Sequence, residues 1–193
     1  NFSKIKGTHT SMKSGMLAAE AVFEAKFCGV VLVCRAVLAI VRAKKSGLMV
    51  NVSSLGGRVT IPFQGFYSAS KYALESMSDA LRMELRPFGV RVVLIEPGDF
   101  KTGFTESRIF SAEASDGSVY SESCQRAVSV MEHDEQNGAD PRLFAELLAK
   151  IIANPSPRNR YPVGALGQRL AVAARRVVPS AFLDKALSAI YKL

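Results

Sequence analysis

Two short apolar runs, Leu-Met-Val-Asn-Val-Ser at 48–53 and Val-Arg-Val-Val-Leu-Ile at 90–95, enclose a helical stretch. Each run has the length and the character of a buried strand. Between them, Leu and Met recur at helical spacing over residues 67–86, until Pro87 and Gly89 end the pattern. Two such strands joined by a helix form a parallel βαβ unit, so the sequence predicts an α/β fold with helices packed on a parallel sheet.

The flanking sequence supplies further helices and one more strand. A nearly continuous apolar stretch over residues 27–42 predicts a helix that is packed on several sides. Residues 104–140 are rich in Ser, Glu and Asp, and we interpret them as a mobile covering segment with one helix at 119–133. An amphipathic helix over residues 143–152, a short strand over 161–164 and two C-terminal helices complete the prediction.

Length and composition are those of a single globular domain. The chain has 193 residues, of which 48% are hydrophobic and 22% are charged. Its formal net charge of +8 comes from Lys and Arg residues that are scattered along the sequence, so we expect a solvated surface and no nucleic acid partner. The most apolar run, residues 27–41, is shorter than the ~20 residues that cross a bilayer, so no membrane span is predicted.

The three cysteines, Cys28, Cys34 and Cys124, indicate neither a disulfide framework nor a metal site. They are odd in number and show no Cys-x-x-Cys spacing. Two of them lie in the apolar stretch over residues 27–42. We therefore predict buried free thiols in a reducing compartment, which favours a cytoplasmic protein without a bound metal.

Tyr67 and Lys71 are the first candidates for chemistry. They stand four residues apart at the start of a predicted helix, so their side chains share one face. An ammonium near a phenol favours the phenolate, so we expect Tyr67 to titrate below its ordinary pKa of ~10 and to act as a general acid or base. Ser54 ends the preceding strand, and its hydroxyl can lie beside Tyr67, where both groups would polarise one substrate carbonyl.

Three stretches together resemble the classical short-chain dehydrogenase/reductase family: Asn51-Val-Ser-Ser-Leu-Gly-Gly57, Tyr67-Ser-Ala-Ser-Lys71 and Arg91-Val-Val-Leu-Ile-Glu-Pro-Gly-Asp-Phe-Lys-Thr102. The resemblance extends over about residues 27–193. It implies a partial doubly wound, Rossmann-like parallel sheet with flanking helices. The first strands and the Gly-rich loop that receives the coenzyme pyrophosphate in this family do not occur in the sequence. We therefore interpret residues 27–193 as a truncated short-chain dehydrogenase/reductase domain.

The same resemblance implies roles for individual residues. Tyr67 would be the catalytic acid or base, Lys71 would lower the pKa of Tyr67 and hold the nicotinamide ribose, and Ser54 would orient the substrate oxygen. Lys26 stands where the family has a proton-relay Asn. An ammonium cannot accept hydrogen bonds as an amide oxygen does, so a relay water would be oriented differently.

Hydride transfer between a nicotinamide coenzyme and a secondary alcohol or carbonyl is the activity that the resemblance implies. The segment that contains Pro97, Gly98 and Thr102 would contact the nicotinamide end of NAD or NADP. The residue that selects between these two coenzymes belongs to the missing part of the family pattern, so the choice stays open. An apolar alcohol or ketone, such as a steroid, a retinoid or a keto-lipid, would be a suitable small-molecule substrate.

The first 23 residues carry a second resemblance, to electron-transfer-flavoprotein:ubiquinone oxidoreductase. Its basis is the run Lys6-Gly-Thr-His-Thr-Ser-Met-Lys-Ser-Gly15. This resemblance implies FAD contacts at Gly7, Thr8 and Ser11, but the dinucleotide fingerprint is absent, so FAD is the less favoured cofactor. We expect instead an amphipathic N-terminal helix, and we assign residues 1–26 to a helical segment of different origin from the domain that follows.

Functions from different classes stay open. The chain is an NAD(P)-dependent oxidoreductase with a Ser-Tyr-Lys site, whose activity in truncated form is in question, or a non-catalytic fragment that dimerises through helices 27–42 and 67–86. A piece of an FAD-linked oxidoreductase is the third alternative. Without the first strands of the family, the strand over residues 48–53 has an unpaired edge, which favours association with another chain.

Overall fold

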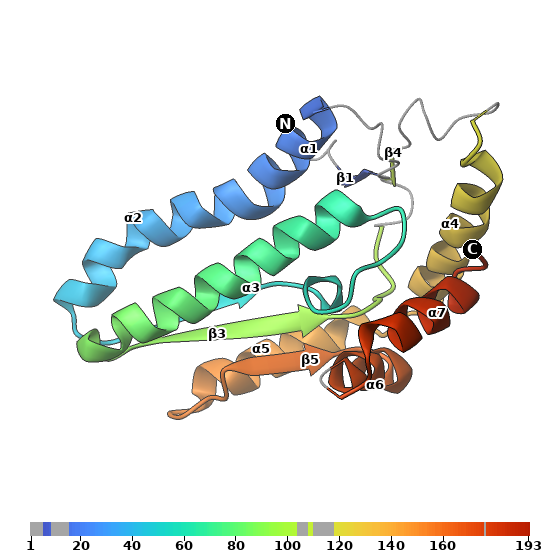
Figure 1. The fold of residues 1–193 in the computed structure, drawn as a ribbon. Helices are drawn as coiled ribbons and strands as arrows, with labels where there is room; N and C mark the ends of the chain where they lie inside the picture. The colour runs from blue at the N-terminus through green and yellow to red at the C-terminus, as the bar shows by residue number, and fades with distance from the viewer. Residues whose placement is uncertain (1–5, 9–15, 104–107, 110–117, 176) are drawn as a thin grey trace.

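A parallel sheet of three strands forms the centre of the computed structural model, which describes residues 6–8, 16–103, 108–109, 118–175 and 177–193. Strands β2 (Gly47–Val52), β3 (Val90–Pro97) and β5 (Arg160–Val163) lie in the order β2-β3-β5, and both pairs are parallel. Helix α3 (Gly65–Leu85) connects β2 to β3 (Figure 1). The predicted βαβ unit and the α/β fold class are therefore confirmed.

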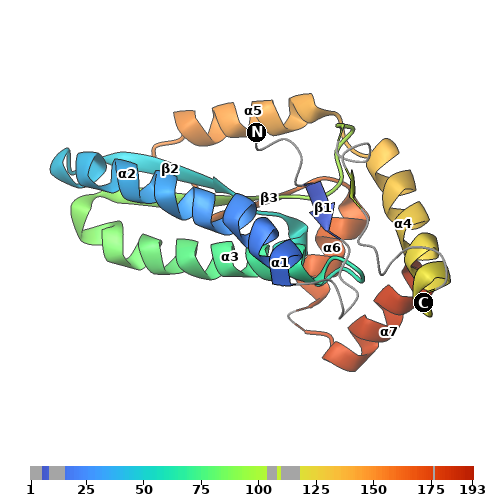
Figure 2. The same ribbon diagram turned by 90° about the horizontal axis from the view of Figure 1, so that it is seen from above.

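Helices cover both faces of this sheet. α2 (Gly29–Ala43) and α3 pack on one face, and α5 (Pro141–Ala153) packs on the other (Figures 1 and 2). Successive side chains of a strand point to opposite faces, so Val92 joins the core below α2 and α3 whereas Val93 joins the core below α5. A strand enclosed on both faces has a continuous apolar sequence, which explains the pattern of residues 90–95.

The other predicted helices occur close to their expected positions. α4 (Ser121–Gln136) precedes α5, and α6 (Leu166–Ala174) and α7 (Ser180–Ile190) end the chain. Asp140 caps α5, because its side chain accepts a hydrogen bond from the backbone N–H of Arg142 at 2.8 Å. Residues 104–107 and 110–117, which are part of the predicted covering segment, lie outside the described residues. Within the described residues, no helix combines the length and the hydropathy that crossing a membrane requires.

The outer face of α2 contradicts the expectation of a helix that is packed on several sides. Cys34 is its one buried residue, whereas Leu32 and Val33 are each more than half exposed. One side of α2 contacts α3 and the sheet, and its apolar residues there belong to the shared core. The apolar residues of this run therefore lie on both a packed face and an exposed face of α2. Cys28, which we expected to be buried, is also exposed, while Cys34 and Cys124 are buried free thiols.

The N-terminal segment contains a strand in addition to the expected helix. β1 (Lys6–Thr8), which includes Gly7 and Thr8, pairs in parallel with β4 (Arg108–Ile109). α1 (Met16–Phe23) follows and continues through a π-helical turn (Glu24–Cys28) into α2. The prediction of a helix is right from Met16 onward and wrong for β1, because its pairing partner lies far along the chain and leaves no local pattern. Ser11 lies outside the described residues.

Candidate active site

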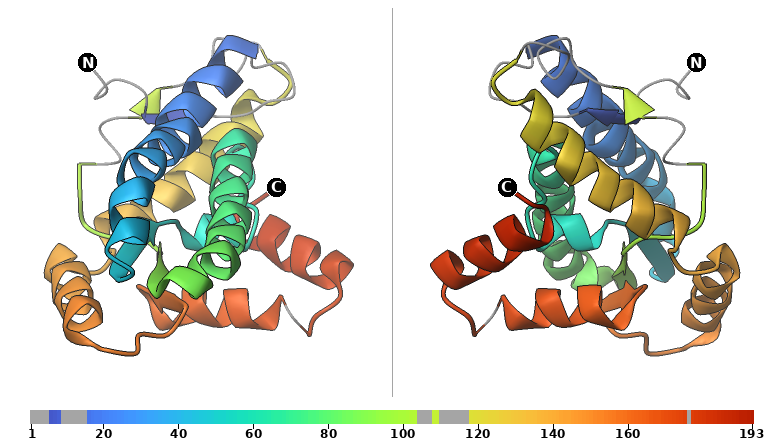
Figure 3. Two further views of the ribbon diagram at one scale, coloured as in Figure 1. Left: turned by 90° about the vertical axis from the view of Figure 1, so that its left-hand side faces the viewer. Right: turned by 90° about the vertical axis from the view of Figure 1, so that its right-hand side faces the viewer.

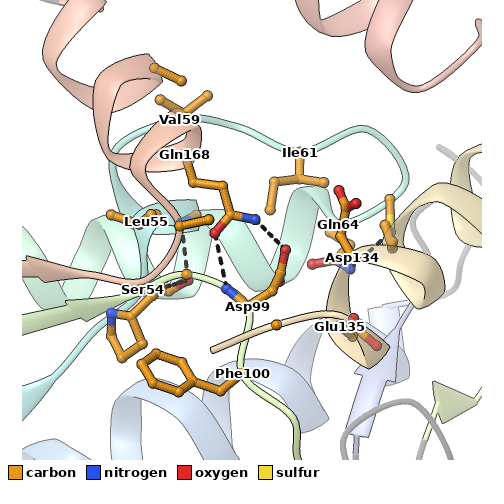
Figure 4. Close-up of a pocket in the computed structure, with 18 of the residues that line it drawn as sticks. Ser54, Leu55, Val59, Ile61, Gln64, Asp99, Phe100, Asp134, Glu135 and Gln168 are labelled. Carbon is orange, nitrogen blue, oxygen red and sulfur yellow. Dashed lines mark hydrogen bonds between the residues drawn. The ribbon is translucent and has the colours of Figure 1, made fainter. Parts of the chain in front are cut away.

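A cavity of about 750 Å³ opens where β2 and β3 end. Ser54, Tyr67, Pro97, Gly98 and Thr102 all line it, together with residues of α4, α6 and α7. Figure 4 shows Ser54 at this cavity with Gln168 of α6. The carboxyl ends of parallel strands are the usual place for ligands in open α/β sheets. The structure thus brings five of the six predicted site residues to one cavity. The sixth, Lys71, does not line it.

Ser54 is held by hydrogen bonds at the point where β2 ends. Its Oγ accepts from the backbone N–H of Gly56 at 3.0 Å and donates to the carbonyl oxygen of Pro97 at 3.4 Å. Its side chain also lies near Tyr67 and acts to lower the pKa of the phenol. A Cβ at Gly56 would lie 3.3 Å from both Ser54 Oγ and Tyr67 Cε1, so the absence of a side chain there lets the two groups approach.

The phenol of Tyr67 titrates in the opposite direction from our expectation. Burial raises its pKa above the ordinary value of 10.0, the hydrogen bond with Ser54 opposes this shift, and the charges of Asp99 and Glu135 add to it. Lys71 Nζ lies over the ring, 5.9 Å from its centroid. The expected lowering of the pKa is therefore wrong for this structure, because desolvation is the largest cause of the shift. Tyr67 is a neutral proton donor at neutral pH.

Lys71 is buried between α3 and the end of β2. Its Nζ donates a hydrogen bond to the carbonyl oxygen of Val52 at 3.0 Å. Burial and then the charge of Lys26 lower the pKa of Lys71 from 10.5 to about 8, while Glu75 opposes the shift. Lys26 lies in the π-helical turn before α2. The residue at the relay position of the family thus acts electrostatically on Lys71.

Replacement of Lys26 by Met is expected to raise the pKa of Lys71 from about 8 toward its ordinary value of 10.5. Met keeps most of the side-chain length but removes a like charge, and a like charge disfavours the protonated amine. An NMR titration of the lysine side-chain resonances measures the change. Lys44→Met, at the exposed end of α2, is the matched control and should leave Lys71 unaffected. If Lys26→Met also leaves it unaffected, burial alone sets this pKa.

The prediction from sequence missed Gln168 and three carboxylates that line the cavity, Asp99, Asp134 and Glu135. Gln168 Oε1 accepts from the backbone N–H of Asp99 at 3.1 Å, and its Nε2 donates to the Asp99 carboxylate, so α6 is tied to the loop after β3 (Figure 4). Burial raises the pKa of Tyr191, also in the lining, to about 12, and the three carboxylates contribute to the shift. The fold brings these residues together from distant segments, so no local pattern marks them.

A partly buried ion network fixes α3 on the sheet beside the cavity. Arg160 of β5 pairs with Glu75 and Asp79 of α3 at 3.0 and 2.7 Å, and with Glu96 of β3 at 3.1 Å. Burial raises the pKa of Glu75, and the charge of Arg160 opposes that shift. Glu75 follows Lys71 by about one helical turn. The network therefore sets the position of the helix that carries both Tyr67 and Lys71.

Comparison with known sequences identifies relatives along most of the chain. Residues 6–111 match the short chain dehydrogenase family. A protein of Bacteroides thetaiotaomicron named 3-ketodihydrosphingosine reductase is 41% identical over 167 residues, which are 86% of this chain and 62% of that protein. The uncharacterized oxidoreductase YusZ of Bacillus subtilis is 33% identical over 160 residues, 81% of this chain and 57% of its own length. The chain thus spans about three fifths of the length of these relatives.

Solved structures with the same fold include a short-chain dehydrogenase from Streptomyces avermitilis, with a TM-score of 0.76 and 25% identity over 93% of this chain and 65% of that one. A short chain dehydrogenase/reductase from Burkholderia phymatum in complex with NAD has a TM-score of 0.69 at 23% identity, over 86% of this chain and 59% of that one. The flavoprotein resemblance and the division of the chain at residue 26 stay predictions. Because the family match covers more than half of its residues, the chain belongs to the short-chain dehydrogenase family.

Proposed function

We propose that the chain carries the proton-transfer site of an NAD- or NADP-dependent oxidoreductase that interconverts a secondary alcohol and a ketone. The observation that carries this proposal is that Ser54 and Tyr67 lie on either side of Gly56 and line one largely apolar cavity. Two hydroxyl donors aimed at one carbonyl oxygen stabilise the negative charge that develops there. The raised pKa of Tyr67 keeps its proton available at neutral pH.

The residues around the cavity fit the nicotinamide end of such a coenzyme. Pro97, Gly98 and Thr102 line it on the side of β3, and a Cβ at Gly98 would meet Gln168 Oε1 at 2.2 Å, so the loop fits closely without a side chain. Lys71 lies behind this lining, where its Nζ donates to the carbonyl oxygen of Val52, and its other N–H donors would hold a ribose hydroxyl of the coenzyme. A bound coenzyme would supply the hydride.

The protein side of the reaction is a proton transfer. In the direction of reduction, the hydroxyl of Tyr67 donates its proton to the carbonyl oxygen while the carbonyl carbon accepts a hydride. Ser54 donates a second hydrogen bond to the same oxygen. The Lys71 ammonium, 5.9 Å from the centre of the phenol ring, stabilises the phenolate that remains. Oxidation of the alcohol follows the same path in reverse.

The charge of the cavity predicts which ketones bind poorly. Asp99, Asp134 and Glu135 line it, and none of the described lining residues is Lys, Arg or His. A long-chain ketone should therefore have a kcat/KM about tenfold above that of a keto acid of equal length, because a substrate carboxylate near these groups costs about 1–2 kcal/mol. The relative named for 3-ketodihydrosphingosine also favours a ketone substrate. Steady-state kinetics on the long-chain ketone and on the keto acid of equal length measures this ratio of kcat/KM values. The Asp134→Asn substitution should lower the ratio, because it removes one negative charge from the cavity. A preference for the acid would contradict it.

A second candidate function, a non-catalytic fragment that dimerises, is favoured by exposed apolar side chains on α2 and α3. Leu32 and Val33 of α2 are 64% and 65% exposed, and Met83 of α3 is 70% exposed. A second copy that packed on helices 27–42 and 67–86 would remove this apolar area from water. Dimerisation alone requires no coenzyme.

Thermal denaturation with NADH and with NADPH separates the two candidates. A coenzyme that binds only the folded chain, at 100 times its Kd, stabilises it by about 2.7 kcal/mol and raises Tm by about 5–10 °C. A rise with either coenzyme supports the oxidoreductase. A Tm that depends on protein concentration and on neither coenzyme supports the dimerising fragment and contradicts the oxidoreductase.

A further inference from the structure

Helices α6 and α7 form one wall of the cavity with their inner faces. Gln168 and Ala171 of α6 and Leu187 of α7 line the cavity. Leu187 also packs with Val172 on the loop after β2. The inner faces of α6 and α7 therefore pack against the rest of the fold and line the site.

The outer faces of the same helices expose large apolar side chains. Leu166 and Leu170, one turn apart on α6, are 66% and 57% exposed. Val177, in the turn between the helices, is 82% exposed, and Phe182 of α7 is 69% exposed. Single exposed apolar residues are common, but a group of them on adjacent elements marks a surface that another apolar phase covers. We call these four residues the apolar edge.

The C-terminal sequence that contains the apolar edge is mostly basic. Residues 166–193 contain five basic side chains, Arg169, Arg175, Arg176, Lys185 and Lys192, against the single acidic Asp184. Arg169 and Lys185 are exposed. Helices with one apolar and basic face and one face packed on the protein are typical of elements that lie in the interface of an anionic membrane.

The position of the two helices suits contact with a flat surface. Figure 3 shows α6 and α7 as an angular pair that projects beyond the sheet, with the turn between them at the tip. The most exposed member of the apolar edge, Val177, lies in this turn. The tip can therefore enter a bilayer interface without a change in the rest of the fold.

We propose that the apolar edge and its basic neighbours dock the protein on the surface of an anionic lipid bilayer, with the turn between α6 and α7 inserted among the headgroups. The two helices also line the cavity, so docking would place its wall at the membrane, where apolar ketones are dissolved. This last step rests on the proposed function. The docking itself requires neither coenzyme nor turnover.

Flotation of the full chain with lipid vesicles tests the proposal. The chain should float with vesicles of phosphatidylcholine and phosphatidylglycerol in a ratio of roughly 7:3, because anionic lipids attract basic segments. It should float much less with vesicles of phosphatidylcholine alone. Val177→Asp combined with Phe182→Asp should reduce the bound fraction at least about tenfold, because apolar insertion is lost. Arg169→Glu combined with Lys185→Glu should remove the preference for the anionic lipid.

Ile152→Asp is the matched control, because Ile152 of α5 is 63% exposed but lies outside the apolar edge. It should float as the unchanged chain does, and circular dichroism verifies that every variant is folded. Failure of the unchanged chain to float with the anionic vesicles overturns the proposal. Equal flotation of the double variant Val177→Asp and Phe182→Asp also overturns it. So does a dimer in sedimentation that is lost in this double variant, because a second copy of the chain would then occupy the apolar edge.

Discussion

Tyr67→Phe is expected to lower kcat for ketone reduction by about 10²–10⁴-fold, the contribution of a positioned general acid. The variant loses the phenol hydroxyl but keeps the ring beneath the Lys71 ammonium. The cavity and the coenzyme contacts should therefore remain. The measurement is steady-state turnover of an apolar ketone with saturating coenzyme, together with the coenzyme-induced change in Tm.

Tyr72→Phe provides the matched control for this substitution. Tyr72 lies on the same helix, its hydroxyl donates to the backbone carbonyl of Arg58, and it does not line the cavity. Loss of that hydrogen bond should cost about 0.5–1.5 kcal/mol of stability. We expect its kcat to stay near that of the unchanged chain. Retention of a tenth or more of the turnover in Tyr67→Phe would contradict the role assigned to Tyr67.

Arg160→Met is expected to lower the free energy of unfolding by about 3–5 kcal/mol, because the buried carboxylate of Glu75 loses the charge that Arg160 supplies. The side chain of Glu75 is only 7% exposed, whereas Glu96 keeps an ion pair with Arg58 and Asp79 keeps one with Arg82. Burial raises the pKa of Glu75, and loss of the Arg160 charge raises it further. Protonation of the Glu75 carboxyl at low pH removes the unpaired charge in the variant. The decrease in the free energy of unfolding should therefore be smaller at pH 5 than at pH 8.

Urea denaturation at both pH values measures this loss. Arg142→Ala is the control, since the Arg142 side chain is 88% exposed and lies 3.9 Å from Asp140. Its substitution should change stability by less than about 0.5–1 kcal/mol. Arg160→Met combined with Glu75→Gln should recover part of the stability, since one unpaired charge is removed. A loss for Arg160→Met as small as that for Arg142→Ala would show that the network does not hold α3 in place.

The central βαβ unit could be predicted because its signals are local. The apolar runs that form β2 and β3, and the helical spacing between them, depend only on neighbouring residues. The pairing of β1 with β4 could not be predicted, because it joins residues from opposite halves of the sequence. The exposed face of α2 was missed for a related reason. An apolar residue indicates that burial would be favourable, but it does not indicate whether another element packs against it.

The candidate site was predictable in part. The resemblance implied that Ser54 and Tyr67 act on one substrate oxygen, and in the structure both residues line one cavity. The direction of the Tyr67 pKa was wrong, because helical spacing reports the distance to an ammonium but not the degree of desolvation. Gln168 and the carboxylates of α4 were missed, since only tertiary packing brings them to the loop after β3.

The most direct test of a proton-transfer site at Ser54 and Tyr67 is the transfer of deuterium from coenzyme labelled at the nicotinamide C4 to an apolar ketone. We expect mass spectrometry to find deuterium on the carbinol carbon of the product with the unchanged chain, and a decrease of at least about 100-fold in the rate with Tyr67→Phe. No transfer by a folded chain with either coenzyme, or equal transfer by the Tyr67→Phe variant, would contradict the site.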